Sequence, residues 1–375
     1  MIYLDHNATT PVDERVTRVM DPFFRSAFGN PSSSYQEGQE ARQSLENARA
    51  KAAKALGAKP EEVIFTSGGS ESNNWVIRSL AGSRSGKGHI ITTAIEHPSI
   101  TNPCLYYLDK GVDTTFAGVD SLGVIRVEEI EKAIRPDTFL ISVMHANNET
   151  GVIQPIAEIS KIAKKAGILF HSDAAQTLGK IPVDVNAMGV DFLSVAGHKV
   201  YAPKGIGLLY IREGVELEPL ILGGGQEMGR RAGTENVAMA MGLGMACEYF
   251  TGDMTRHTER LSRLTALLLE LLSEKIPGLV LNGHSDQRLP NCLSVSFPGV
   301  TGADLLAAVP EVRASTGAAC HDRQSAISHV LSAMGVPAEQ ARGTVRLSLG
   351  VHTNQTEIEK AAKLIAIAYE KMTRP

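Results

Sequence analysis

The sequence contains few cysteines, no long apolar run and no concentration of basic residues. Its 375 residues include four cysteines and no CxxC pair, which excludes a disulfide scaffold and gives no sign of a zinc site. No stretch approaches the roughly 18 consecutive apolar residues that a membrane-spanning helix needs. Lysine and arginine number 37 against 41 aspartate and glutamate residues, a net charge of −4. Nucleic acid is therefore not expected as the main partner.

The first five residues also lack the basic flank and apolar core of a secretory signal. We therefore expect a soluble cytoplasmic protein without a membrane partner or a bound metal. The hydrophobic fraction of 43% is ample for a buried core. At roughly 150 residues per domain, the length indicates two or three domains, or a large α/β body with a smaller one.

Short apolar runs alternate with helical segments over the first part of the chain. The runs cover residues 63–66, 89–93, 138–144, 168–171, 192–195 and 207–211. Runs of this length, separated by ten or more residues of helical character, predict parallel strands joined by crossover helices. Helices are predicted over 12–28 and 35–56, each followed by glycine, and over 356–372 with Asn354 as its cap.

The pattern changes after residue 234. It is almost wholly helical to about residue 272 and then turns to short strands and helices, including 292–297, 303–308, 313–315 and 344–348. We therefore predict a large domain over residues 15–260. Residues 1–14 and 261–375 are predicted to form a smaller domain.

Three features lie where an α/β fold places its chemistry, at the carboxyl ends of strands. They are the turn Ser67-Gly68-Gly69-Ser70-Glu71, Asp173 and the segment Gly197-His198-Lys199. Each alone has a structural explanation: a glycine turn, a paired carboxylate or a surface lysine. Together they suit pyridoxal 5'-phosphate (PLP), which needs a lysine for its aldehyde, an acid for its pyridine nitrogen and a phosphate cradle. The combination favours a PLP enzyme.

Seven motifs, in order along residues 3 to about 352, resemble the NifS/IscS-type cysteine desulfurases. They are YLDHNATTP (3–11), GNPS (29–32), FTSGGSESN (65–73), EH (96–97), NNETG (147–151), GHK (197–199) and STGAAC (315–320). The resemblance implies an α/β, fold-type I PLP-dependent transferase. Its large domain would have a mostly parallel seven-stranded sheet, and its smaller α+β domain would carry the catalytic cysteine loop.

The same resemblance implies a homodimer that converts L-cysteine to L-alanine and passes the sulfur, as a persulfide on Cys320, to an acceptor protein that the sequence does not identify. It assigns Lys199 to the covalent bond with PLP and Asp173 to the pyridine nitrogen. His97 would stack on the ring and assist proton transfer. Arg346 would bind the substrate carboxylate, which suits a planar bidentate donor.

The remaining cofactor contacts are also implied by the resemblance. Asn148 and Gln176 would lie near the ring hydroxyl, with Asn148 also near the substrate. The phosphate would be held by Gly69, Ser70 and His198, and Thr234 would reach the phosphate of the other subunit.

The other three cysteines lie in apolar surroundings. Cys104 and Cys247 are in helical stretches and Cys292 begins an apolar run, so all three are predicted to be core residues. Cys320 instead lies between small and polar residues, a composition that suits a reactive loop thiol.

Other activities stay open at this point. Residues 317–321 (GAACH) and 233–236 (GTEN) look more like the selenocysteine lyases, so release of selenide from L-selenocysteine is the alternative. A PLP aminotransferase or β-lyase would not need Cys320, and a catalytically silent subunit would need none of these groups.

Overall fold

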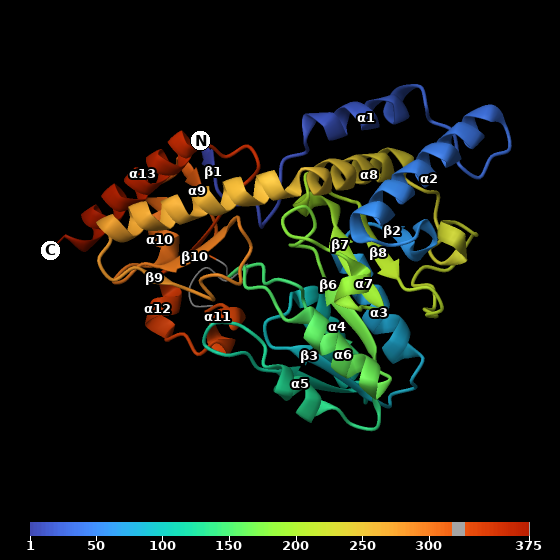
Figure 1. Ribbon diagram of the computed structural model, residues 1–375, viewed down its shortest axis with the longest axis horizontal. Helices are drawn as coiled ribbons and strands as arrows, with labels where there is room; N and C mark the ends of the chain where they lie inside the picture. The colour runs from blue at the N-terminus through green and yellow to red at the C-terminus, as the bar shows by residue number, and fades with distance from the viewer. Residues whose placement is uncertain (317–326, 375) are drawn as a thin grey trace.

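The computed structural model describes residues 1–316 and 327–374, and its larger part is built on one seven-stranded sheet (Figure 1). The strand order is β2-β8-β7-β6-β5-β3-β4. The strands are β2 (Val63–Thr66), β3 (His89–Thr93), β4 (Asp113–Ala117), β5 (Thr138–Ser142), β6 (Leu169–Asp173), β7 (Phe192–Ala196) and β8 (Gly207–Ile211). The mostly parallel seven-stranded sheet is confirmed.

Two details of the sheet differ from the prediction. β8 was expected to be parallel, but it pairs antiparallel with both β2 and β7. Only residues 197–206 join β7 to β8, and this link is too short to hold a crossover helix. The edge strand β4 was missed, because its sequence DTTFA is largely polar and only its last residue is buried.

Side chains alternate between the two faces of the sheet, as the period of a strand requires. Ile64, Ile90 and Leu140 face one side, where they pack with apolar residues of α3 (Gly69–Gly82) and α4 (Pro98–Leu108). Their neighbours Val63, Ile91 and Ile141 face the other side. The helices on that side are α1 (Glu14–Arg25), α2 (Gln36–Leu56), α5 (Val127–Ala133), α6 (Ile156–Ala166), α7 (Val185–Met188) and α8 (Val237–Gly252).

The smaller part has a core of its own. Its antiparallel sheet has the order β12-β10-β9, and the N-terminal β1 pairs with β11. The strands are β1 (Ile2–Tyr3), β9 (Val280–Leu281), β10 (Cys292–Ser296), β11 (Val312–Arg313) and β12 (Thr344–Ser348). The helices are α9 (Met254–Lys275), α10 (Gly302–Ala307), α11 (His329–Ala333), α12 (Ala338–Arg342) and α13 (Gln355–Thr373).

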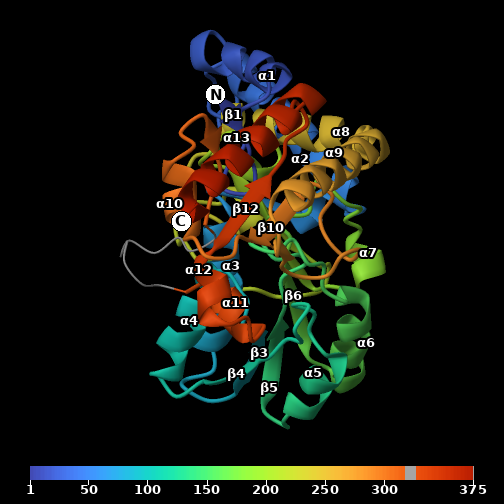
Figure 2. The same ribbon diagram turned by 90° about the vertical axis from the view of Figure 1, so that its left-hand side faces the viewer.

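The two parts are joined along α8 and α9, which follow each other with only Asp253 between them (Figure 1). Figure 2 shows that β1, near the N-terminus, lies beside α13, the last helix of the chain. The separate apolar clusters support the proposal that residues 15–260 form one domain and residues 1–14 with 261–375 the other.

Local signals set several helix ends. Gly57 ends α2 in the left-handed conformation, at φ 66°, which a glycine adopts without strain. Asn354 accepts a hydrogen bond from Glu357 and forms a capping box with it at the start of α13. Cys104, Cys247 and Cys292 are buried, as predicted. Within residues 1–316 and 327–374, no helix combines the length and apolar character needed to span a membrane.

Candidate active site

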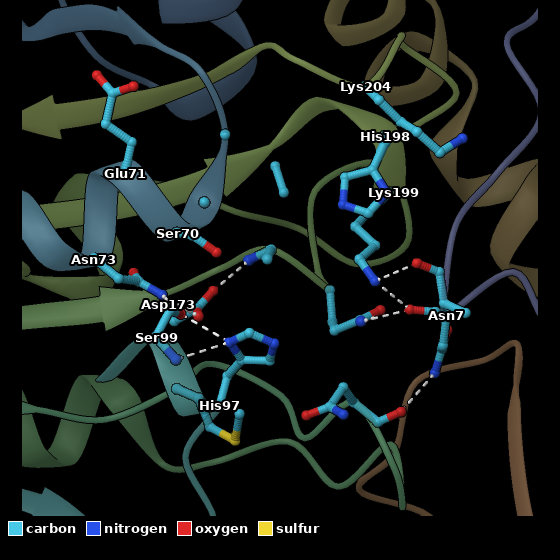
Figure 3. A pocket seen from close by; sticks show the side chains of 18 of the residues that line it. Asn7, Ser70, Glu71, Asn73, His97, Ser99, Asp173, His198, Lys199 and Lys204 are labelled. Atoms are coloured by element: carbon cyan, nitrogen blue, oxygen red, sulfur yellow. Dashed lines mark hydrogen bonds between the residues drawn. The ribbon is translucent and has the colours of Figure 1, made fainter. Parts of the chain in front are cut away.

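A cavity of about 620 Å³ lies at the carboxyl ends of the central strands (Figure 3). Parallel neighbours in a sheet bring their carboxyl ends to one edge, so residues distant in sequence converge there. Nine of the predicted site residues line this cavity: Gly69, Ser70, His97, Asn148, Asp173, Gln176, His198, Lys199 and Arg346. Arg346 comes from β12 of the smaller sheet, so the cavity draws on both parts of the chain.

The turn after β2 presents the start of α3 to the cavity. Gly68 has φ 153°, a conformation that side-chain-bearing residues rarely adopt. The Ser67 amide donates to Glu71 Oε2 at 2.9 Å, which fixes the turn. The N–H groups in the first turn of a helix have no intrahelical acceptor, so together with the hydroxyl of Ser70 they can bind an anion.

His198 adds a further donor to this end of the cavity. One ring nitrogen lies 3.1 Å from Thr9 Oγ1. Burial, with a smaller contribution from the nearby lysines, lowers the pKa of His198 to about 4. The ring is therefore neutral near pH 7 and can donate one N–H group.

Asp173 ends β6 and is almost fully buried. Its Oδ2 accepts a hydrogen bond from Asn73 Nδ2 at 2.7 Å, and its Oδ1 accepts one from the Ala175 amide at 2.9 Å. These neutral donors satisfy the carboxylate without a side-chain cation, so its charge remains available to a cationic group in the cavity.

Hydrogen bonds connect the same Asn73 amide group, through Ser99, to His97. Asn73 Nδ2 lies 2.8 Å from Ser99 Oγ, which lies 2.8 Å from His97 Nδ1. The Ser99 amide also donates to His97 Nδ1, so this nitrogen is the acceptor and Nε2 carries the proton. Desolvation lowers the pKa of His97, with Asp173 acting in the opposite direction.

Lys199 follows β7 and reaches across the cavity. Its Nζ donates to the carbonyl oxygens of Asn7 at 2.5 Å and Ala8 at 2.7 Å (Figure 3). Burial lowers the pKa of Lys199 to about 8, and the positive charge of Arg346 contributes to this shift. A lysine with this pKa has far more of its nucleophilic free amine near neutral pH than an ordinary lysine has.

Arg346 is held by two groups at one side of the cavity. Its Nη1 donates to the Asn148 carbonyl at 2.9 Å, and its Nη2 lies 2.7 Å from Asp5 Oδ1. Among the described residues its buried Nε has no hydrogen-bond partner. The guanidinium is thus fixed in position beside the cavity, where a substrate carboxylate could reach it.

Of the predicted site residues that the structure describes, Thr234 alone does not line this cavity. Thr234 is exposed and lines a neighbouring cavity of about 250 Å³ that shares Ser67, Gly205 and Ile206 with the first. Cys320 lies outside the described residues.

Several residues of the site were not given a role from the sequence. Asn7, Asn73 and Asp5 belong to motifs that carried the resemblance, so their positions were marked but not their contacts. Ser99 and Lys180 carried no signal that distinguishes them from ordinary helix or loop residues. In the described part of the chain, no group of three or more His, Cys, Asp or Glu side chains is placed to bind a metal ion.

Comparison with known proteins gives one consistent result. The family profile of the class-V aminotransferases matches residues 2–361. A cysteine desulfurase IscS from Dictyoglomus turgidum is 46% identical over 374 residues, which is 99% of this chain and 95% of that protein. A cysteine desulfurase IscS from Methanosarcina thermophila is 44% identical, with coverage of 99% and 92%.

Solved structures agree with these relatives. A NifS-like protein superimposes with a TM-score of 0.92 at 40% identity, with 98% of each chain covered. A structure of SspA in complex with cysteine gives a TM-score of 0.85 at 39% identity and covers 94% of this chain and all of that one.

Proposed function

The chain belongs to the class-V aminotransferase family, in its cysteine desulfurase group, and from this we infer that it is a PLP-dependent enzyme that removes sulfur from L-cysteine. The observation that carries the proposal is the placing of Lys199 and Asp173 in one cavity with the anion-binding turn after β2. The relatives named cysteine desulfurase favour cysteine over selenocysteine as the substrate, and the SspA structure contains cysteine.

The donor set in the cavity fits PLP. Ser70, His198 and the first turn of α3 would hold its phosphate, and Asp173 would pair with its pyridine nitrogen. Lys199 would bond to its aldehyde carbon, and Gln176 would donate to its ring hydroxyl. When bound, PLP supplies an electron-accepting ring that stabilises negative charge on the substrate Cα.

The residues of the chain would then bind the substrate and move its protons. Arg346 would bind the carboxylate of L-cysteine through its two terminal nitrogens. Lys199, once its amine is free, would take the proton from the substrate Cα as a positioned base, which its lowered pKa favours. His97, with its proton on Nε2, could donate from the other side of the cavity.

Sulfur transfer requires a nucleophilic thiol, which we assign to Cys320. As a thiolate, its sulfur would attack the substrate sulfur, so that an S–S bond forms as the Cβ–S bond breaks. The electron pair of the broken bond remains with the carbon product, and Cβ takes a proton. The products are L-alanine and a persulfide on Cys320, with carbon reduced and sulfur oxidised. Later transfer of the persulfide sulfur to an acceptor protein would restore the thiol.

The deciding experiment measures alanine from L-cysteine and from L-selenocysteine, with a dithiol as sulfur acceptor. We expect Cys320→Ala to abolish alanine release from cysteine but to keep measurable release from selenocysteine, because the C–Se bond is weaker. Cys247→Ala, which removes a buried thiol in α8, is the matched control and should remain active on cysteine. Wild-type protein active only on selenocysteine would reverse the choice of substrate, and full activity of Cys320→Ala on cysteine would exclude the persulfide route.

Cofactor binding has its own test. The purified protein should absorb in the visible range, and borohydride should fix the cofactor to Lys199. A colourless protein that takes up no PLP would contradict the proposal.

We further propose that the enzyme is a cytoplasmic homodimer in which Thr234 reaches the phosphate of the partner subunit's cofactor. The exposure of Thr234 beside a second cavity supports this role. Light scattering should give twice the 40.1 kDa mass of one chain, and a monomeric mass would refute the shared site.

A further inference from the structure

Lys180 is a buried lysine for which the mechanism above has no use. It lies on the segment after β6 and exposes 6% of its surface. No carboxylate of the described residues forms an ion pair with it. Burial, together with the positive charges of Lys199 and Arg346, lowers the pKa of Lys180 to about 7. A buried amine without a counter-ion is costly, so the position calls for an explanation.

The amine of Lys180 donates to two side-chain amides. Its Nζ lies 3.0 Å from Gln176 Oε1 and 3.3 Å from Asn7 Oδ1. An ammonium group has donors only, so it requires the oxygen of each amide to face it. The nitrogen of each amide is thereby directed elsewhere.

The amide nitrogens of Gln176 and Asn7 both donate to backbone carbonyls in the active site. Gln176 Nε2 donates to the Asn7 carbonyl at 3.0 Å, the same oxygen that accepts from Lys199 Nζ. Asn7 Nδ2 donates to the Asn148 carbonyl at 3.3 Å, the same oxygen that accepts from Arg346 Nη1. Figure 3 shows Asn7 beside Lys199, with dashed lines for its hydrogen bonds.

We propose that Lys180 is a positioning residue that sets the amide orientation of Gln176, so that Gln176 presents its N–H group to the ring hydroxyl of the bound cofactor. This inference rests on the proposed function, since it assumes that the cavity takes PLP. Asn7 Oδ1 also accepts a hydrogen bond from Asn291 Nδ2 at 3.1 Å, so Asn7 keeps its orientation without the ammonium group. The amide that would be released to rotate by half a turn is that of Gln176. Gln176 would then turn its carbonyl oxygen toward the Asn7 carbonyl, which is repulsive, and would offer the ring hydroxyl an acceptor in place of a donor.

The test is Lys180→Met, which keeps an unbranched side chain and removes the ammonium group. We expect the affinity of the full-length apoprotein for PLP, measured by fluorescence titration, to fall roughly tenfold. The pH midpoint of the cofactor's visible absorbance should move upward, because a nearby positive charge has been removed. The unfolding temperature of the apoprotein should not fall, because the variant removes a buried charge that has no counter-ion.

A double-mutant cycle with Gln176→Leu separates positioning from general packing. If Lys180 acts through Gln176, Lys180→Met should add little once Gln176 has been replaced. Lys180→Arg, which keeps a cationic donor, should recover part of the PLP affinity.

Three outcomes would overturn the inference: unchanged PLP affinity and absorbance midpoint in Lys180→Met, additive losses in the double variant, or no recovery with Lys180→Arg. If Lys180→Met also unfolds at a lower temperature, the double-mutant cycle with Gln176→Leu decides whether Lys180 positions Gln176 or only supports the packing. Wild-type protein that binds no PLP would instead refute the proposed function.

Discussion

Replacing Asp5 by asparagine tests how the proposed substrate-binding arginine is held. Asp5 Oδ1 lies 2.7 Å from Arg346 Nη2, and their side chains are 20% and 6% exposed. Asp5→Asn keeps the size of the side chain but removes its charge, so the buried guanidinium loses its counter-ion. Breaking a fully buried pair costs about 3–5 kcal/mol. Because Asp5 is partly exposed, we expect the free energy of unfolding of the substrate-free protein to fall by about 2 kcal/mol.

The same change should strengthen substrate binding. In the wild type, the carboxylate of L-cysteine must share the guanidinium with Asp5. Two carboxylates roughly 6 Å apart repel each other by about 3 kcal/mol at an effective dielectric constant of about 20. Solvent in the open cavity screens part of this repulsion, so we expect KM to fall by about three- to tenfold with little change in kcat.

A pH profile gives a second, independent readout of Asp5→Asn. The negative charge of Asp5 raises the pKa of Lys199, against the larger lowering effect of burial. Without this charge the pKa of Lys199 should fall below about 8. The acidic limb of kcat, which reports the substrate complex in which the Lys199 amine is free, should therefore move to lower pH.

The assays are steady-state alanine release between pH 6 and 9 and thermal unfolding of the apoprotein. Asp13→Asn is the matched control, because buried Asp13 pairs with the partly exposed Arg15 at 2.6 Å but does not line the cavity. The control should lose stability without a change in KM. An unchanged or higher KM in Asp5→Asn, with stability lowered, would refute the competition between the two carboxylates and leave Asp5 a structural partner only.

Three further predictions concern stability. Burial lowers the pKa of His145 from 6.5 to about 4. Between these two pH values the unfolded chain binds more protons than the folded protein, so the free energy of unfolding falls as the pH drops through this window. The share of His145 is on the order of 3 kcal/mol, and urea titrations at pH 7 and 4.5 should show a smaller pH difference in His145→Gln. A Cβ at Gly207 would lie 2.5–2.6 Å from backbone atoms of β7 and of the turn after β2. Gly207→Ala should therefore weaken PLP binding at least tenfold and lower the unfolding temperature. The control Gly118→Ala, whose Cβ meets no atom within 4 Å, should change neither property. Glu227 and Arg49 form a buried ion pair of 2.6 Å, and Glu227→Gln should cost about 3 kcal/mol in chemical denaturation; a loss below about 1 kcal/mol would show that the pair is dispensable.

The sequence predicted the elements whose signal is local. Six strands of the large sheet were evident as apolar runs, because both faces of a covered sheet are buried. The ends of α2 and α13 followed from Gly57 and Asn354, where one residue satisfies or terminates the backbone hydrogen bonds of the helix. The burial of Cys104, Cys247 and Cys292 followed from their apolar neighbours. The ordered motifs likewise indicated the family and the residues around the cavity.

Only the tertiary structure decided which strands and side chains meet. The apolar pattern of residues 207–211 is the same for a parallel and an antiparallel strand, so the direction of β8 depends on the short link from β7. Asp5 and Arg346 are 341 positions apart and pair because Asp5, just after β1, forms a parallel bridge with Ser348 of β12, the strand that carries Arg346. The contacts of Lys180 with Asn7 and Gln176 arise in the same way. The periodicity of a sequence indicates whether a side chain is buried, but tertiary packing determines which residue it contacts. The hydrogen bonds that orient this site depend on those contacts.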